Sequence, residues 1–383
     1  DPAGLLGGFT YFDAQTDDAR LVLELIDGAI SVGAVCVNYC ELIELTEKAG
    51  KICGAVLQDK INQELISIKA TQIVDTTGRW SAKFQKDKAS YRLTKGIHLV
   101  MPKTVTNEAL LLTAKFDGRV FFIIPWYSLT LLGTTDTNFD GDIENISISD
   151  ADIRYLLSEA NQVLKTVNWT EQDIIGKFAG VRVLQQSQDN NPSSISRDWT
   201  LKISATGLLS SIGGKLTSAR EDAAVIVDTL CLQLGNPATC QTFGKIFPWL
   251  SGTEYQSLLE NSLSEAEQLG IDKEIALWLV KRHGSRVSSV FQLCVDKPEL
   301  TKKITPGLPF ILADLVFCAR EEMIVHLDDL LRRRLPLLIL AQLSLDELTL
   351  LARLTAKTLA WDAKKTEVEI KRCLQLQSSR KEN

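Results

Sequence analysis

The run Ser-Ile-Gly-Gly-Lys-Leu-Thr at residues 211–217 is the strongest candidate for ligand chemistry in the sequence. It joins an apolar strand to a helix through Gly213 and Gly214, which allow the backbone to approach a ligand closely. The free N–H groups at the start of a helix favour an anion, while Lys215 adds a positive charge and Thr217 a hydroxyl. The glycine spacing of a P-loop is absent. The run therefore predicts an anion site, with a tight turn and a solvated lysine as the alternative.

Two arginines could supply further positive charge to such a site. Arg182 ends the strand-like run Ala-Gly-Val-Arg, and Arg197 stands beside Asp198 further along the chain. Guanidinium groups bind phosphate and carboxylate oxygens through paired hydrogen bonds. The two arginines are therefore candidates for an anionic ligand, although Arg197 could instead pair with Asp198 at the surface.

A histidine and two hydroxyl-rich runs complete the set of candidates. His98 lies in an otherwise apolar strand pattern, where it is either a core residue or a general base, because the pKa of histidine lies near neutrality. The run Val-Asp-Thr-Thr-Gly at 74–78 could pass its backbone along a dinucleotide. The run Leu-Gly-Thr-Thr-Asp-Thr at 132–137 is either a polar turn or a ligand loop.

The predicted secondary structure that positions these residues is mixed helix and strand in the first part of the chain and helical in the last part. A helix over 16–32, capped by Thr16, and an amphipathic helix over 149–165 stand among strand-like runs, and a third helix over 216–234 follows the two glycines. Strands are predicted at 10–14, 34–40, 53–59, 65–70, 72–76, 97–101, 109–114, 120–124, 129–134, 175–180, 200–204 and 208–212. Beyond 244–248 helical periods dominate, at 253–269, 272–283, 286–296, 308–333, 344–358 and 361–375. This pattern predicts an α/β and α+β unit over 1–244 and a helical C-terminal domain over 245–383.

The composition excludes several classes of protein. Lys and Arg number 42 against 48 Asp and Glu, and the net charge of −6 argues against general nucleic-acid binding. No apolar run approaches the roughly 20 residues that a membrane-spanning helix needs. The eight cysteines form no CxxC pair, which indicates reduced thiols and a cytoplasmic protein, and the three histidines are too dispersed for a local metal motif. The basic run before Leu335–Leu338 is either a solvated helix face or a contact with an anionic membrane surface.

Several of these segments, in this order, resemble FAD-dependent glycerol-3-phosphate dehydrogenases. The resemblance covers nearly the whole chain, and its motifs are YFDAQTDDARL at 11–21, KGIH at 95–98, IPW at 124–126, GTTDT at 133–137, GVR at 180–182, RD at 197–198, GGKLT at 213–217, REEM at 320–323 and DDLLRRR at 328–334. It implies the glutathione-reductase-like, DAO-type fold of FAD-dependent oxidoreductases, followed by an all-α C-terminal domain.

The resemblance also implies a reaction and the residues that carry it. The reaction is oxidation of sn-glycerol 3-phosphate to dihydroxyacetone phosphate, with hydride transfer to FAD. A quinone is the expected electron acceptor, and oxygen or another carrier is the alternative. The family would place His98 and Arg182 in the catalytic site, and would use Arg182, Arg197 and Lys215 to bind substrate. The cofactor would lie against Thr77, Gly78, Gly213, Gly214, Lys215, Leu216 and Thr217. A peripheral location on the inner face of the membrane and a homodimer are further implications.

The sequence departs from the family pattern at several positions. The family motif Asn-Ala-Thr-Gly-Pro-Trp reads Asp-Thr-Thr-Gly-Arg-Trp at 75–80, so Arg79 stands where the family has proline. Val183 replaces the proline after the substrate arginine, and Ser-Ala-Arg at 218–220 replaces Thr-Tyr-Arg. These differences affect the expected geometry of the flavin site.

The glycine-rich dinucleotide fingerprint that opens the family is absent from the sequence. No Gly-x-Gly-x-x-Gly occurs, so we expect that the N-terminal Rossmann segment is missing and that residues 1–383 alone hold FAD poorly and are inactive. Two alternatives stay open at this point. One is a related flavin amine or amino-acid oxidase, and the other is a flavin-free fragment that acts as a binding module.

Overall fold

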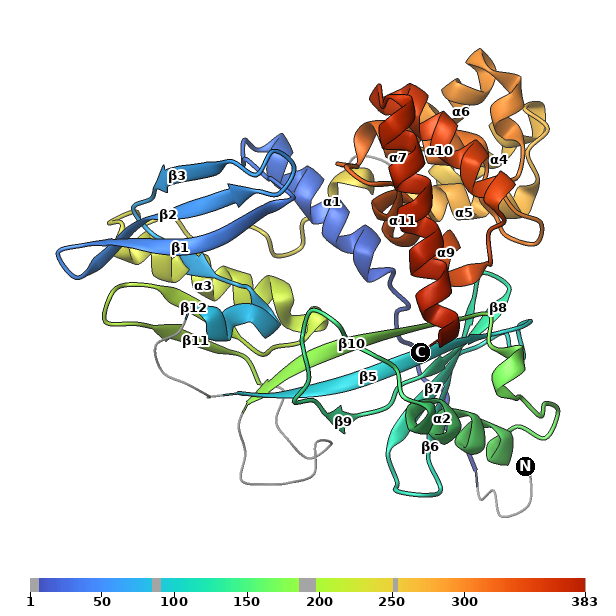
Figure 1. Ribbon diagram of the computed structural model, residues 1–383, viewed down its shortest axis with the longest axis horizontal. Helices are drawn as coiled ribbons and strands as arrows, with labels where there is room; N and C mark the ends of the chain where they lie inside the picture. Colours follow the sequence, from blue (N-terminus) through green and yellow to red (C-terminus); the bar gives the residue numbers. More distant parts are fainter. Residues whose placement is uncertain (1–6, 85–90, 186–197, 251–253, 383) are drawn as a thin grey trace.

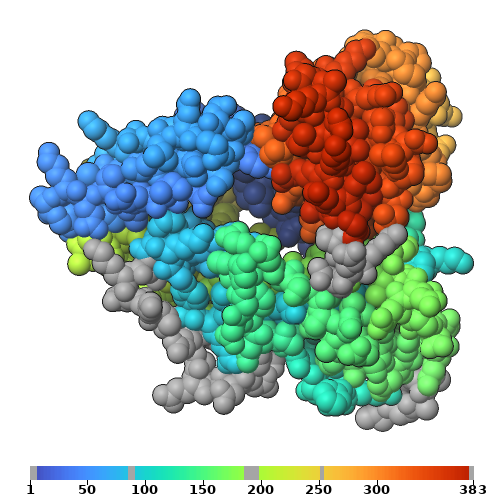
Figure 2. Space-filling view, viewed as in Figure 1, coloured from blue at the N-terminus to red at the C-terminus, as the bar shows by residue number. Residues whose placement is uncertain are grey.

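The computed structural model describes residues 7–84, 91–185, 198–250 and 254–382. In these residues, three β-sheets form one side of the molecule and a group of helices forms the other (Figure 1). The helix α1 (Asp18–Ser31) lies between the sheet β1–β3 and the helical group. In the same view, Figure 2 shows a hollow where the blue sheet, the red helices and the green strands meet.

The central element is a six-stranded sheet with the order β10-β5-β8-β7-β6, in which β9 also pairs with β5. Its strands are β5 (Tyr91–Met101), β6 (Leu110–Thr113), β7 (Val120–Trp126), β8 (Leu129–Gly133), β9 (Thr137–Asn138) and β10 (Gly176–Gln185). Helix α2 (Asp150–Val163) covers one face, and its Ile153, Leu156 and Ala160 share a buried core with Ile97 and Leu99 of β5. Because side chains alternate along a strand, the other face of β5 is left for the site and the helical group.

Two smaller sheets flank the central one. The sheet β1 (Cys40–Lys48), β2 (Lys51–Asp59) and β3 (Leu65–Lys69) is antiparallel. The second sheet has the order β11-β12-β4, formed by Thr200–Ile203, Leu209–Ile212 and Val74–Asp75. Helix α3 (Ala219–Gln233) follows β12 and exposes Val225, Val227 and Leu232. The parallel pairing of β12 with β4 decides the geometry of the site described below, because parallel strands end at the same edge.

The C-terminal part is helical. Its α-helices are α4 (Tyr255–Gln268), α5 (Lys273–His283), α6 (Val287–Asp296), α7 (Leu312–Glu321), α8 (Leu327–Asp329), α9 (Leu337–Leu340), α10 (Leu345–Leu359) and α11 (Ala363–Glu382). Its core extends into the central sheet, because Val100 of β5 and Tyr127 at the β7–β8 turn are buried with it. At Gly176 of β10, a Cβ atom would lie 1.9 Å from the carbonyl oxygen of Ile339. Glycine at this position therefore lets α9 pack directly on the strand.

Some predicted elements are wrong. Residues 10–14 form no strand, and only Cys40 of the predicted strand 34–40 belongs to a strand, whereas β1 over Cys40–Lys48 was missed. The N-cap of α1 is Asp17 and not the predicted Thr16. Oδ1 of Asp17 accepts a hydrogen bond from the backbone N–H of Arg20 at 3.2 Å. The predicted helix over 308–333 is interrupted after Glu321, because Met323 adopts a left-handed backbone (φ 53°).

We propose that the boundary between the units 1–244 and 245–383 lies in an exposed connection, and we expect limited proteolysis to cut there. Residues 236–247 contain no helix or strand, and the side chains of Phe243 and Phe247 are exposed there. Exposed irregular segments are the preferred sites of proteolysis. Brief chymotrypsin treatment should cut the chain there first, and mass spectrometry under denaturing conditions should identify the helical C-terminal piece. First cleavage inside 308–333 would contradict the proposed boundary.

Candidate active site

The register of β5 against β10 places His98 and Arg182 on one face of the central sheet. His98 lies directly opposite Phe178, and Arg182 lies opposite Thr94. Directly opposite residues of an antiparallel pair share a face, and so do alternate residues of one strand. His98, Thr94 and Arg182 therefore share the face that helix α2 does not cover. The sequence motifs around 95–98 and 180–182 meet because of this pairing.

Two glycines make room for these side chains. A Cβ atom at Gly96 would lie 2.6 Å from Nη2 of Arg182, and one at Gly133 would lie 2.4 Å from Cδ2 of His98. Contacts this short do not occur between a real Cβ and a ring or guanidinium atom. The glycines of the predicted KGIH and GTTDT motifs are therefore needed for space above the sheet.

Residues of the run 133–137 hold Arg182 in place. Its Nη2 donates a hydrogen bond to Oγ1 of Thr134 at 3.1 Å, and its Nη1 lies 3.5 Å from Oδ1 of Asp136. The Asp136 side chain is largely buried, and that of Arg182 is 31% exposed. An anchored, partly exposed guanidinium is well suited to bind an anion from solvent. Thr134 and Asp136 of the run 132–137 therefore orient Arg182.

The second wall is built by the sheet β11-β12-β4. Leu209 pairs with Val74 and Ser210 with Asp75 in parallel register, so the residues after both strands leave the sheet side by side. Gly213 and Gly214 have φ angles of 75° and 93°, which favour glycine, and a Cβ at Gly213 would lie 2.8 Å from the carbonyl oxygen of Asp198. The predicted runs 74–78 and 211–217 are thus brought together.

These walls enclose a cavity of about 650 Å³, within the usual range for small-molecule sites. Seven of the predicted site residues line it: Thr77, Gly78, Arg182, Gly213, Gly214, Lys215 and Leu216. The other lining residues were not predicted to be site residues, although all but Leu184 belong to the motifs and departures named in the sequence: Thr76, Arg79, Trp80, Val181, Val183, Leu184 and Ser211. Thr217 follows in the short 3-10 turn Leu216–Ser218 without lining the cavity. Arg197 lies outside the described residues.

His98 lies on the same sheet face without lining this cavity. Its ring stacks on Phe178 with a centroid distance of 5.0 Å. Burial, together with the charge of Arg182, lowers the pKa of His98 to about 4. The imidazole is therefore neutral at pH 7 and can accept a proton.

Comparison with known proteins identifies the family. Residues 1–220 match the family described as FAD dependent oxidoreductase, which is more than half of the chain. The chain belongs to this FAD dependent oxidoreductase family. Residues 248–366 match the C-terminal domain of alpha-glycerophosphate oxidase. The DAO-type fold and its helical C-terminal domain, both predicted from the sequence, are confirmed by these matches.

Individual relatives of the chain carry a more specific name. Aerobic glycerol-3-phosphate dehydrogenases of Staphylococcus aureus strains USA300 and MRSA252 are 32% identical over an alignment of 348 positions that covers 86% of this chain. The same alignment covers 62% of each relative, so the chain spans less than two thirds of their length. The structure of a glycerol-3-phosphate dehydrogenase from Bacillus halodurans complexed with FAD matches with a TM-score of 0.82 and 27% identity. That match covers 95% of this chain and 73% of the other. The predicted resemblance to this group is thus confirmed.

The helical domain of this family member contains a buried charge cluster that sequence reasoning missed. Arg20 of α1 donates to both carboxylate oxygens of Glu322, at 2.6 and 2.9 Å, and Arg286 donates to the same carboxylate at 2.7 Å. Asp314 is fully buried and forms an ion pair with Arg282. The cluster therefore ties α1 to α5 and α7. Its members are up to 302 positions apart in sequence, so no local motif reveals it.

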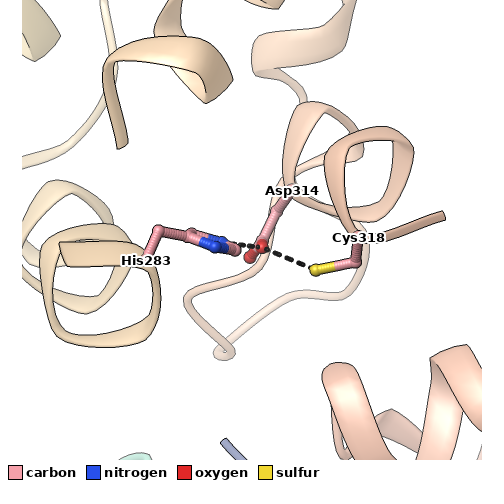
Figure 3. Close-up of side chains that lie close together, drawn as sticks. All are labelled: His283, Asp314 and Cys318. Carbon is pink, nitrogen blue, oxygen red and sulfur yellow. Dashed lines mark hydrogen bonds and ion pairs between the residues drawn. The ribbon is translucent and has the colours of Figure 1, made fainter. Parts of the chain in front are cut away.

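His283, Asp314 and Cys318 lie close together within this cluster (Figure 3). Nε2 of His283 is 2.7 Å from Oδ1 of Asp314, and Nδ1 of His283 is 3.4 Å from Nη2 of Arg20. Burial lowers the pKa of His283, so the neutral ring donates through Nε2 and accepts through Nδ1. Burial also raises the pKa of the Cys318 thiol. With both ring nitrogens engaged and two guanidiniums adjacent, the donor set suits an ion-pair core better than a metal cation.

The burial of most of the run Arg332–Leu338 argues against the membrane contact that was one of its two interpretations, and Arg334 does not fit the other interpretation, a solvated helix face. Leu335, Leu337 and Leu338 are fully buried in the helical core. Arg334 is also buried, and it donates to the carbonyl oxygen of Glu322 at 2.6 Å. Because the apolar side chains face inward, this run offers no apolar surface to a bilayer. Among the described helices, none is long and apolar enough to cross a membrane.

Proposed function

We propose that the chain takes part in FAD-dependent oxidation of sn-glycerol 3-phosphate to dihydroxyacetone phosphate. The names of the relatives support this substrate. The observation that carries the proposal is the cavity, in which Arg182 and Lys215 meet the Gly213-Gly214 turn. Two cationic groups beside a glycine turn, where no side chain blocks the approach to the backbone, suit a ligand that carries phosphate.

The residues at the two strand ends fit a flavin cofactor. Thr77 and Gly78 follow β4, the residues from Gly213 to Thr217 follow β12, and the cavity lies between the two segments. The positive φ angles of Gly213 and Gly214 bring the backbone to the cavity wall without side chains. When bound, FAD would accept the hydride from C2 of the substrate.

The remaining residues would bind the substrate and move its proton. Arg182 and Lys215 would hold phosphate oxygens, and Arg197 is proposed to join them. His98 is neutral at pH 7 and would accept the proton of the C2 hydroxyl as hydride leaves. A phosphate dianion on Arg182 would offset the charge that disfavours protonated His98. Substrate binding would therefore strengthen the base.

The substrate can be tested by flavin absorbance. The protein expressed from its natural gene is supplied with FAD and mixed anaerobically with sn-glycerol 3-phosphate. Loss of the 450 nm band and formation of dihydroxyacetone phosphate are expected. Glycine, sarcosine and glycerol are the controls. If an amine bleached the flavin and sn-glycerol 3-phosphate did not, the protein would be an amine oxidase and the proposed substrate would be wrong.

The titration of His98 gives an independent prediction. Because burial and Arg182 both disfavour the charged ring, its NMR titration should fall below pH 5. Arg182→Met removes the charge and leaves the burial, so the pKa should rise but stay below 6.5. Lys215→Met is the control with no expected shift, and His98→Gln assigns the signal. A wild-type midpoint near 6.5 would contradict the buried environment.

Three further proposals concern the electron acceptor, the cellular location of the protein and its oligomeric state. We propose a quinone, since the relatives are named dehydrogenases, although the C-terminal match is named for an oxidase. Steady-state rates with a soluble quinone analogue and with oxygen alone would separate the two acceptors. A cytoplasmic protein held peripherally at the inner membrane face is tested by flotation with anionic liposomes, and the homodimer by light scattering.

A further inference from the structure

The cavity contains a cationic side chain that the family motif does not. Arg79 lines the cavity together with Arg182 and Lys215. It is the second residue of the 3-10 turn Gly78–Lys83, which begins shortly after β4 ends. The motif that this segment resembles has proline at position 79. Arginine at this position therefore adds a positive charge near the start of the turn, where the family motif has an uncharged residue.

The position of the Arg79 side chain is fixed by an aromatic neighbour. Its guanidinium carbon lies 4.1 Å from the centroid of the Trp80 ring. The indole Nε1 of Trp80 donates to Oε1 of Glu144 at 2.7 Å, which fixes the ring. Stacking on an aromatic face leaves the edge of the guanidinium free to donate hydrogen bonds in its own plane. The contact therefore orients Arg79 without using its donors.

The hydrogen-bonding capacity of Arg79 is not used within the described residues. Its Nε is buried and has no hydrogen-bond partner there. The carboxylate of Glu144 is taken by Trp80 and by Lys83, whose Nζ lies 3.5 Å away. No carboxylate in the described part of the chain forms an ion pair with Arg79. A buried donor left unpaired costs free energy, which an oxyanion placed in the cavity would recover.

We propose that Arg79 is a specificity-determining residue that binds the phosphate oxyanion of the substrate in this cavity. The inference rests on the proposed function for the identity of the substrate. The shared chemistry is an oxyanion, which the phosphate of the substrate or that of FAD could supply, and we assign it to the substrate. Arg79 and Lys215 approach it from the two strand ends, and Arg182 from the central sheet.

Titration calorimetry on the protein expressed from its natural gene tests the assignment, with inorganic phosphate, sn-glycerol 3-phosphate and FAD as separate probes. The variants are Arg79→Met, Arg79→Lys and Arg79→Pro, the last of which restores the family residue. Arg154→Met is the matched control, because Arg154 is exposed and pairs only loosely with Asp150 at 4.0 Å. Thermal melting of each variant shows that it is folded.

Arg79→Met and Arg79→Pro should weaken both phosphate and sn-glycerol 3-phosphate roughly 10- to 100-fold, the effect of losing one charge-assisted interaction. Arg79→Lys should keep part of the affinity, and Arg154→Met and the binding of FAD should not change. Unchanged phosphate binding in a folded Arg79→Met protein would overturn the inference and leave Arg79 as a stacking partner of Trp80. Loss of FAD affinity alone would overturn it too, by moving the oxyanion to the cofactor.

These experiments distinguish a failure of the inference about Arg79 from a failure of the proposed function. If phosphate binding depends on Arg79 but sn-glycerol 3-phosphate is not oxidised, the oxyanion site stands and the assigned substrate is wrong. If sn-glycerol 3-phosphate is oxidised with the same KM in Arg79→Met, the function stands and the role of Arg79 is wrong. Absence of both phosphate and sn-glycerol 3-phosphate binding in the wild-type protein would overturn the inference about Arg79, whereas the proposed function is decided by the flavin absorbance test.

Discussion

Glu322→Gln should lower the free energy of unfolding by about 3–5 kcal/mol, the cost of breaking a buried ion pair from one side. The Glu322 carboxylate accepts two hydrogen bonds from Arg20 and one from Arg286, and its side chain is 1% exposed. A neutral amide leaves both guanidiniums without their counter-charge and sets an NH₂ group against a donor. Urea unfolding followed by circular dichroism measures the change.

The neighbouring Glu321 provides the matched control. It is exposed, so Glu321→Gln makes the same chemical change outside the cluster and should alter stability by less than about 0.5 kcal/mol. Arg20→Met removes the partner on α1 and should cost a similar amount to Glu322→Gln. Equal midpoints for Glu322→Gln and Glu321→Gln would show that the cluster contributes no net stability.

The same carboxylate makes stability depend on acid pH. Burial alone would raise the pKa of Glu322, but Arg20 and Arg286 outweigh it and lower the pKa to about 2. The unfolded chain has the ordinary pKa and binds the proton more readily between these values. The stabilisation is therefore fully present above pH 4.5 and is lost as the pH falls toward 2. Glu322→Gln should remove this part of the acid sensitivity.

Elements with a strong period and local capping were predicted well from the sequence. Helix α2 begins at the predicted Ser149, whose hydroxyl accepts from the backbone of Asp152 in a capping box. β1 was missed because its glutamates recur at every third position (41, 44 and 47) on a sheet that is largely exposed, so neither an apolar run nor a period of two marks it. The break at Met323 depends on a backbone angle that helical periodicity does not encode. Local chemistry was therefore more informative than apolar runs.

In the candidate site, too, some features could be predicted from the sequence and others only from the structure. The glycine turn at 213–214 and the GVR run were visible as local motifs, but the prediction that Arg182 ends its strand is wrong, since β10 continues to Gln185. Their meeting depends on the pairing of β12 with β4, which is set by contacts distant in sequence. Arg79 was visible only as a departure from the family motif, and its position on Trp80 and in the cavity comes from the structure.

Replacing Arg182 should have the largest effect on catalysis by the proposed enzyme. Arg182→Met removes charge-assisted hydrogen bonds to the substrate, and we expect a loss of about 2–4 kcal/mol of transition-state stabilisation. At 1.36 kcal/mol per tenfold, this corresponds to a fall in kcat/KM of roughly 30- to 1,000-fold. Arg182 is held by Thr134 and Asp136 before any ligand arrives, so little of its binding energy is lost in ordering the side chain. Steady-state kinetics with sn-glycerol 3-phosphate measures the change.

Two comparisons separate a role in binding from a role in folding. Arg182→Lys keeps the charge but loses the planar pair of donors, so its kcat/KM should lie between the wild-type and Arg182→Met values. Arg182→Met also leaves Asp136 without this partner, and thermal melting shows how much of the loss is structural. The catalytic loss should persist in protein that is fully folded at the assay temperature. If folded Arg182→Met retains the wild-type kcat/KM, Arg182 serves only to balance the charge of Asp136, and the phosphate must be bound without it.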